Sequence, residues 1–237
     1  VYGPHPAGNV GVQIGNISPI NAGERVWTVT PQDVATIGEL FLTGKFNATR
    51  TVALVGSEVK DAQYYNVISG ASIADLVAGK IEGDNVRVIS GDVLTGTKVK
   101  MDGNLGFLSN TVTVIPEGNV YRMFGWMPFA SPSVHSASRT GLSWLMPGKK
   151  YAPNTNLNGE ERALVVTGEM EAVMPLDIFP MQLLKACLAS DIDKMESLGI
   201  YEVAPEDFAL IDYTNTSKLE AQQIIREALD LMIKEVG

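Results

Sequence analysis

The fold of this chain is decided by residues 3–44, GPHPAGNVGVQIGNISPINAGERVWTVTPQDVATIGELFLTG. The glycines and prolines at the start of this stretch predict a packing loop, because glycine lets backbone approach backbone where a Cβ would collide. A helix signal follows, with Thr30 as N-cap, Pro31 at the first helical position and Gly44 as the stop. The helical spacing predicts one apolar stripe, formed by Val34, Ile37, Leu40 and Phe41.

A short apolar run, TVALVG at residues 51–56, comes soon after this helix. Unbroken apolar runs of this length are typical of strands that are buried on both faces of a parallel sheet. Loop, helix and strand together predict the closing part of an α/β domain over residues 1–60.

Residues 61–125 have another pattern, in which short strands are separated by Gly, Asp and Asn turns. One short helix, SIADLVAG, is framed by Ser72 and Asp75 and ends at Gly79. Valines that alternate with threonines in TVTVI, residues 111–115, indicate a half-buried strand. Strands around one short helix predict a β-grasp, ubiquitin-like domain. The expected strands are residues 65–68, VRVISG, TKVKM and TVTVI.

The rest of the chain divides into a connecting segment, residues 126–168, and a helical part, residues 169–237. The connecting segment gathers Trp126, Phe129 and Trp144 among turn residues. Three interpretations stay open for these side chains: burial beneath the segment, contact with a neighbouring protein of a complex, and contact with a membrane edge. In the helical part, Ser217 and Glu220 predict a capping box for the last helix. Apolar residues at near-helical spacing predict a small helical bundle, with Ile178, Leu183, Leu184 and Leu188 in one stripe and Cys187 buried beside it.

Composition and charge exclude several classes of function. The chain has 237 residues, 45% of them hydrophobic, and a formal net charge of −9. This acidity argues against nucleic acid and against docking on an anionic leaflet, because both require basic surfaces. No apolar run approaches the roughly 18 residues of a membrane helix, so no transmembrane segment is expected. The single cysteine, Cys187, provides neither an internal disulfide nor a four-cysteine iron–sulfur site.

The motifs GPHPAG, VWTV and QDV, in that order, resemble the NqrA family, which provides the A subunits of the bacterial sodium-translocating NADH:quinone oxidoreductases. That family is distantly related to the flavin-binding subunit of respiratory complex I and to the C subunit of the Rnf complex. The resemblance covers essentially the whole chain. Because the chain opens at Val1, without a methionine and inside a family motif, we expect it to correspond to the second half of a longer subunit.

The resemblance implies a fold and a domain division. Residues 1–60 would be the remnant of a Rossmann-like α/β domain. Residues 61–125 would be a β-grasp domain of the soluble-ligand-binding (SLBB) type, whose pattern is carried by NVRVISGDVLTGTKV, residues 85–99. A connecting segment (126–168) and a C-terminal helical bundle (169–237) would follow. The fold class is then α/β plus α+β. In related families the SLBB type can bind cobalamin-like ligands, and here we expect a structural and contact module.

The resemblance also implies a function. The chain would be a peripheral subunit on the cytoplasmic face of the bacterial inner membrane, in a complex that couples NADH oxidation and quinone reduction to sodium export. Its partners would be the other subunits, which hold the flavins and iron centres, and this chain would carry no cofactor. We expect a supporting role in quinone binding or assembly and no catalysis by the isolated chain. Cysteines that hold iron–sulfur clusters in relatives are missing from IDYTNTSK, residues 211–218, where only Ser217 and Lys218 remain of the motif.

Motifs of catalysis and metal binding are absent from the sequence, which has no GxSxG, HExxH or P-loop and no metal-spaced Cys/His cluster. No catalytic and no metal-binding residue is therefore named. A quinone pocket needs apolar walls and one or two hydrogen-bond donors. The opening loop provides partial candidates in His5, Asn9 and Gln13, beside Val10 and Val12. The alternative for His5 is a turn residue bonded to backbone.

A second hypothesis from another class stays open: a free-standing, flavin- and NADH-binding dehydrogenase fragment related to the flavin-binding subunit of complex I. It requires a glycine-rich phosphate-binding fingerprint, which the opening loop lacks. The missing fingerprint and the missing cysteines favour the accessory role in a complex. The two hypotheses predict different colours for the purified protein, because a flavoprotein absorbs visible light.

Overall fold

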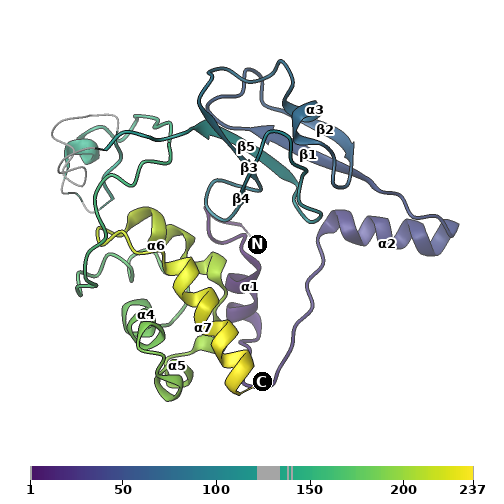
Figure 1. Ribbon diagram of the computed structural model, residues 1–237. Helices are drawn as coiled ribbons and strands as arrows, with labels where there is room; N and C mark the ends of the chain where they lie inside the picture. Colours follow the sequence, from purple (N-terminus) through teal and green to yellow (C-terminus); the bar gives the residue numbers. More distant parts are fainter. Residues whose placement is uncertain (1, 122–133, 138, 140, 237) are drawn as a thin grey trace. The chain divides into compact units, whose positions relative to one another are not determined.

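The structure is a computed structural model that describes residues 2–121, 134–137, 139 and 141–236. Its contacts divide the chain into two compact units. The helical unit comprises Val1–Trp27, Arg122–Lys149 and Leu157–Gly237, and the sheet unit comprises Thr28–Tyr121 and Lys150–Asn156. The main elements are, in chain order, α1 (Val10–Ile17), α2 (Pro31–Thr43), β1 (Thr49–Val55), β2 (Gln63–Ile68), α3 (Ile73–Val77), β3 (Val86–Ser90), β4 (Thr97–Val99), β5 (Thr111–Pro116), η2 (Leu142–Leu145), α4 (Pro180–Leu188), α5 (Ile192–Ser197), η3 (Ile200–Glu202), η4 (Pro205–Phe208), α6 (Ala209–Thr214) and α7 (Ala221–Glu235) (Figure 1).

The sheet unit contains one five-stranded mixed sheet in the order β2-β1-β5-β3-β4. β1 and β5 run parallel at its centre, and every other neighbouring pair is antiparallel. α3 contributes Ile73, Leu76 and Val77 to the core that the strands form on one face of the sheet. A parallel central pair with one short helix packed against the sheet is β-grasp-like, as the sequence predicts.

Two strands differ from their predicted burial. β1 is fully buried on one face only, through Arg50, Val52 and Leu54, whereas Thr49 and Thr51 on the other face are exposed. It also belongs to the β-grasp-like sheet, so the prediction that residues 51–56 close a separate parallel sheet is wrong. β5 is buried on both faces from Val112 to Ile115, and the Thr113 hydroxyl donates a hydrogen bond to the carbonyl of Gly91 (2.8 Å). The prediction of a half-buried strand is therefore wrong for β5.

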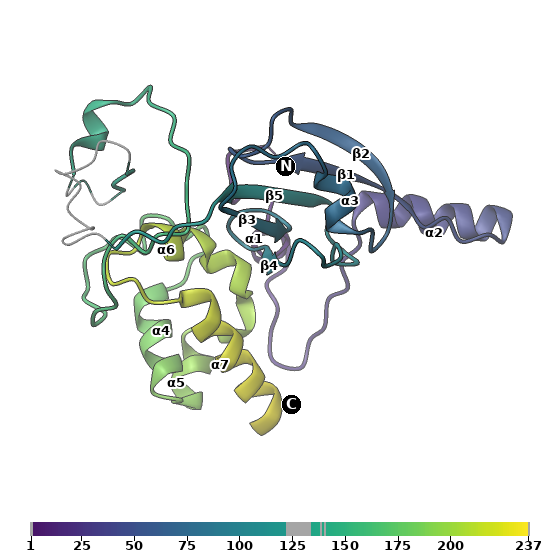
Figure 2. The ribbon, with the colours of Figure 1, turned by 45° about the horizontal axis from the view of Figure 1, so that its top comes forward.

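α2 has the predicted termini but not the predicted burial. The Thr30 hydroxyl accepts a hydrogen bond from the Asp33 N–H, and the helix ends at Gly44 in the left-handed region (φ 72°). None of its residues is buried, and Phe41 is 84% exposed. Figures 1 and 2 both show α2 projecting beyond the edge of the sheet. The apolar stripe of α2 is thus unpartnered within the described residues.

The first turn of α2 is fixed to β1 by side chains. The Gln32 amide accepts from the Thr51 N–H (2.9 Å) and donates to the Thr51 carbonyl (3.0 Å), as a neighbouring strand would. The buried Arg50 guanidinium donates to the Asp33 carboxylate and to the carbonyl of Phe107. Hydrogen bonds from Thr30 and the charge of Arg50 hold the pKa of Asp33 below its usual value. These contacts tie the VTPQDV segment to the sheet.

The helical unit has its own core, formed by α4, α5, α6, α7 and the short 3₁₀ turns between them. The expectation that Cys187 is buried among apolar side chains is confirmed, and burial raises the pKa of its thiol to about 11. Leu188, by contrast, is 56% exposed and not part of the predicted buried stripe. The largest fully buried side chains of this core are Met181, Leu183, Leu184, Met195, Ile200, Phe208, Ile211 and Ile225.

α7 begins at Ala221 without the predicted capping box of Ser217 and Glu220. The Asp212 carboxylate on α6 accepts from the N–H groups of Ala221 and Gln222 instead. The Ser217 hydroxyl donates to the carbonyl of Ala163 (3.1 Å). The capping-box prediction is wrong because a carboxylate from another helix satisfies the first N–H groups of α7.

The opening glycines also form a helix that the sequence pattern did not reveal. α1 includes Gly11 and Gly15, so the prediction of a continuous packing loop is wrong there. A Cβ on Gly11 would lie 2.5 Å from the nearer carboxylate oxygen of Asp207. Asp207 is 2% exposed and accepts from the Ala204 N–H (2.9 Å). Gly11 therefore leaves room for a buried carboxylate beside the first turn of α1, whose N–H groups favour negative charge.

We expect Gly11→Ala to lower the free energy of unfolding by about 1–2 kcal/mol, the usual cost of overpacking. The added methyl displaces the Asp207 carboxylate, and this outweighs the gain of about 1 kcal/mol that alanine brings to a helix interior. Gly38→Ala in α2 is the matched control, because a Cβ there meets nothing within 4 Å. That variant should be at least as stable as the parent in urea unfolding followed by circular dichroism. Equal stability gains in both variants would contradict the packing of Asp207 against Gly11.

Part of the connecting segment lies outside the described residues, including Trp126 and Phe129. Trp144 is described and lies in η2 with 55% of its surface exposed. The interpretation that these aromatic side chains are buried beneath the connecting segment is therefore wrong for Trp144, as far as the described residues show. The four-part domain division stays a prediction.

Candidate functional site

Of the three predicted quinone contacts, His5 lies in the turn that precedes α1, Asn9 is the N-cap residue of α1, and Gln13 lies within α1. His5 is exposed in that turn. The side-chain N–H₂ of Asn9 donates to the carbonyl of Glu206 (3.3 Å). That of Gln13 donates to the carbonyls of Ala7 and Gly8 (3.4 and 3.3 Å). Asn9 and Gln13 thus brace the loop, and their donors are directed at the protein itself.

The predicted apolar wall beside these residues is divided. Val12 is buried in the helical unit, whereas Val10 is 41% exposed. Because the two valines face different environments, they do not form one continuous wall. Of the predicted site, the structure leaves His5 and Val10 facing outward and uses the rest for packing.

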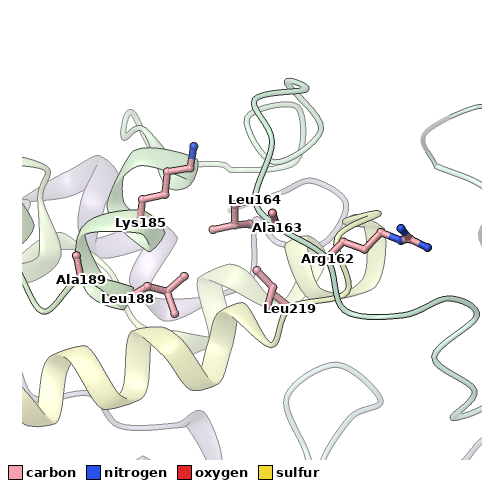
Figure 3. A pocket seen from close by; sticks show the side chains of 7 residues that line it. All are labelled: Arg162, Ala163, Leu164, Lys185, Leu188, Ala189 and Leu219. Atoms are coloured by element: carbon pink, nitrogen blue, oxygen red, sulfur yellow. The ribbon is translucent and has the colours of Figure 1, made fainter.

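A cavity of about 540 Å³ lies elsewhere in the helical unit, and Figure 3 shows the residues around it. Leu164 and Ala163 come from residues 160–167, which have no regular secondary structure, Leu188 from the last turn of α4, and Leu219 from the segment before α7. These apolar side chains form its wall. The remaining lining residues are Ala189, Arg162 and Lys185.

Two cations bracket this apolar cavity. Arg162 lies in the segment of residues 160–167 and Lys185 on α4, and both are exposed. Figure 3 shows the guanidinium and the ammonium group on opposite sides, with Leu164 and Leu219 between them. Neither cation forms a salt bridge with a residue that the structure describes. Residues 162–164, 185, 188, 189 and 219 share no motif, so the sequence did not predict this site.

The sheet unit has a separate charged cluster. Glu117, just after β5, accepts hydrogen bonds from Arg87 on β3, from Lys98 on β4 and from Thr155. The bond from Arg87 is the main cause that lowers the pKa of Glu117 to about 2. The Thr155 hydroxyl also accepts from the Gly118 N–H (2.7 Å). All donors come from within the unit, so the cluster fastens residues 150–156 to the sheet.

The described residues contain no group of three or more His, Cys, Asp or Glu side chains placed to hold a metal ion. Among the same residues, no helix combines the length and the apolar character that crossing a membrane requires.

Two family models match the chain. One, described as the NqrA second alpha/beta domain, matches residues 1–46. The other, described as the NQRA C-terminal domain and of the SLBB type, matches residues 51–101. The second match begins within β1 and ends just after β4, so it supports the assignment of these strands to the β-grasp-like part.

Curated proteins that are named as the A subunit of the Na(+)-translocating NADH-quinone reductase are similar to nearly the whole chain. That of Neisseria meningitidis serogroup B is 39% identical over 234 residues, which are 98% of this chain and 52% of the relative. That of Serratia proteamaculans is 40% identical and that of Vibrio campbellii 38%, with the same two shares. The chain thus spans about half the length of the curated relatives it matches. The predicted resemblance is confirmed.

Proposed function

We propose that this chain, which is related along its length to the A subunits of the Na(+)-translocating NADH-quinone reductases, acts as part of such a protein. In this role it belongs to a membrane complex that couples NADH oxidation and quinone reduction to sodium export. The chain is a peripheral component on the cytoplasmic face. Flavins and iron centres belong to the other subunits, and this chain assists assembly or quinone binding without catalysing electron transfer itself.

The observation that carries this proposal is the sequence identity of 39% to the Neisseria meningitidis A subunit over 98% of the chain. It spans both units, so the sheet unit and the helical unit are retained together in the relatives. Such joint retention is expected when both units contact other parts of one assembly.

The proposal is tested by tagging the protein in its host and purifying it from detergent-solubilised membranes. The other subunits should co-purify, and removal of its gene should abolish sodium-stimulated quinone reduction by NADH in membranes. Recovery of the tagged protein alone, together with unchanged sodium-stimulated activity in the deletion strain, would contradict the proposal.

The alternative, a flavin- and NADH-binding dehydrogenase fragment, has a separate test. If it is correct, the purified chain is yellow and oxidises NADH with an artificial acceptor. Under the proposal, the purified chain shows no flavin absorbance in the visible range and no such activity.

We also propose the finer division of the fold. Residues 1–46, which match a model for an α/β domain, contain α1 and α2 and no strand among their described residues. α2 exposes an unpartnered apolar stripe. We infer that α2 covers a sheet of a Rossmann-like domain formed by other polypeptide. With β1 counted in the β-grasp domain, the first boundary moves from residue 60 to before Thr49, and the connecting segment and helical bundle follow as the sequence predicts.

For quinone, we propose that the opening loop contributes only part of a pocket, with His5 as its available donor. Asn9 and Gln13 are already bonded to chain carbonyls, which supports a bracing role for both. Calorimetric titration of the isolated chain with a short-chain quinone should show no binding, because a half-pocket leaves the ring in water. Micromolar affinity that His5→Ala abolishes would show instead that the pocket is complete.

A further inference from the structure

Beside the cavity, residues 160–167 have no regular secondary structure, and part of their main chain has no hydrogen-bond partner among the described residues. The Arg162 N–H donates to the carbonyl of Ser217 (2.8 Å), and the carbonyl of Ala163 accepts from the Ser217 hydroxyl. From Leu164 to Val166, no N–H or C=O group forms a hydrogen bond with the part of the chain that the structure describes. A main chain with such groups can accept another extended chain, as a strand edge does, because each group lacks the partner that a sheet would supply.

The side chains around this edge are apolar and accessible. Val165 and Val166 are 61% and 66% exposed, and Leu188 across the cavity is 56% exposed. The cavity volume of about 540 Å³ is sufficient for one or two aliphatic side chains of an incoming strand. Side chains that alternate along an added strand place every second one on the same face. An added strand can therefore bond to the edge and fill the cavity at the same time.

The charges at the cavity favour an occupant of negative charge. Arg162 and Lys185 stand at its rim without a salt bridge to the described residues, in a chain whose formal net charge is −9. Two cations around an apolar cavity complement an aliphatic residue flanked by carboxylates.

From these three features, we propose that residues 162–167, together with Lys185, Leu188 and Leu219, form a docking groove for an extended acidic segment of another protein in the complex. The segment adds as a strand along Leu164–Thr167, places an aliphatic side chain in the cavity, and pairs its carboxylates with Arg162 and Lys185. The inference rests on the proposed function, because it requires a neighbouring polypeptide in the complex. A lipid would match the charges and the apolar wall but would leave the peptide edge unpaired.

Proline substitutions test the added strand directly, because proline removes one N–H. In an extended segment, consecutive N–H groups point to opposite sides. One of the two variants Val165→Pro and Val166→Pro should therefore weaken binding at least about tenfold, and the other should stay within about twofold. Neither N–H is bonded within the described chain, so both variants should keep the parent's melting temperature. Val165→Ala and Val166→Ala control for the loss of the side chains.

The measurement is the apparent Kd with which the purified full-length protein rebinds a complex stripped of it. Arg162→Glu and Lys185→Glu should each raise this Kd about tenfold. Arg226→Glu, an exposed cation on α7 in the same unit, should leave it within about twofold. If the parent protein does not rebind at all, the proposed function fails. If the parent protein rebinds and both proline variants bind as tightly as the parent, the groove is refuted and the proposed function is not.

Photo-crosslinking identifies the occupant. A benzophenone side chain installed in place of Leu188, within the assembled complex, should crosslink to an acidic segment of another protein in the complex. The matched probe in place of Ile233, which is 69% exposed on α7, should not give that product. Crosslinks from position 188 only to lipid, only to this chain or to nothing would each overturn the proposal.

Discussion

Gly56→Ala is expected to unfold the five-stranded sheet, with a loss of at least about 4 kcal/mol in the free energy of unfolding. Gly56 follows β1 at φ 124°, and a Cβ there would lie 1.9 Å from the carbonyl oxygen of Val114 and 2.7 Å from its nitrogen. Val114 lies on β5, whose main chain is fixed by its ladder with β3. The methyl group can be accommodated only if β1 and β5 separate, and these strands form the centre of the sheet.

The measurement is hydrogen exchange of the amides in β1, β3 and β5, which should lose protection in the variant. Gly70→Ala is the matched control, with a similarly positive φ of 79° and no atom within 4 Å of the added Cβ. This control should lower the free energy of unfolding by only about 1–2 kcal/mol, which is the strain of a non-glycine residue in the left-handed region. If Gly56→Ala is as mild as this control, the close approach of Gly56 to β5 does not exist.

Features that local sequence determines were predicted correctly. Thr30, Pro31 and Gly44 mark the ends of α2 because a cap, a fixed φ and a left-handed stop act within a few residues. Ser72 caps α3 through the Asp75 N–H for the same reason. β2, β3, β4 and β5 were predicted from the turns between them, with alternating side chains as a further signal in β4 and β5. Such signals need no knowledge of the remaining chain.

Features that depend on distant residues were not predicted. Gly11 looks like loop glycine in the sequence, but the residue that requires its missing Cβ is Asp207, far along the chain. The cap of α7 comes from Asp212 and not from the nearby Ser217. The membership of β1 in a sheet with β5 is likewise a tertiary contact. A single sequence contains no signal that identifies such pairs.

The candidate cavity illustrates the same limit for function. Arg162, Lys185 and Leu219 belong to three segments that only the packing of the helical unit brings together. The predicted site at His5, Asn9 and Gln13, by contrast, was chosen for donors close together in sequence. The structure shows that two of these donors hold the loop itself.

The ion pair between β1 and α2 should be the other major contributor to the stability of the sheet unit. We expect Arg50→Met to lower the free energy of unfolding by about 2–3 kcal/mol, because methionine fills the space but removes the charged donor that the Phe107 carbonyl and the Asp33 carboxylate share. The hydroxyls of Ser69 and Thr30 would still donate to these two acceptors. The value stays below that of a fully buried pair, since the Asp33 side chain is 29% exposed and can be hydrated.

Lys98→Met is the matched control for this prediction. Lys98 also bonds to a carboxylate but is 62% exposed, so this variant should lower the free energy of unfolding by less than about 1 kcal/mol.

The pH dependence of stability gives a second check of the Arg50–Asp33 pair. The pKa of Asp33 is lowered in the folded chain, so the pair stabilises above the ordinary aspartate value of about 4 and loses its effect as the pH falls through the lower folded value. Urea unfolding at pH 7 and at successively lower pH should therefore show the difference between parent and Arg50→Met shrinking towards acid, where the protonated carboxyl no longer needs the guanidinium. A difference that is constant over this range would mean that Arg50 stabilises the sheet only through Phe107 and packing, without its charge.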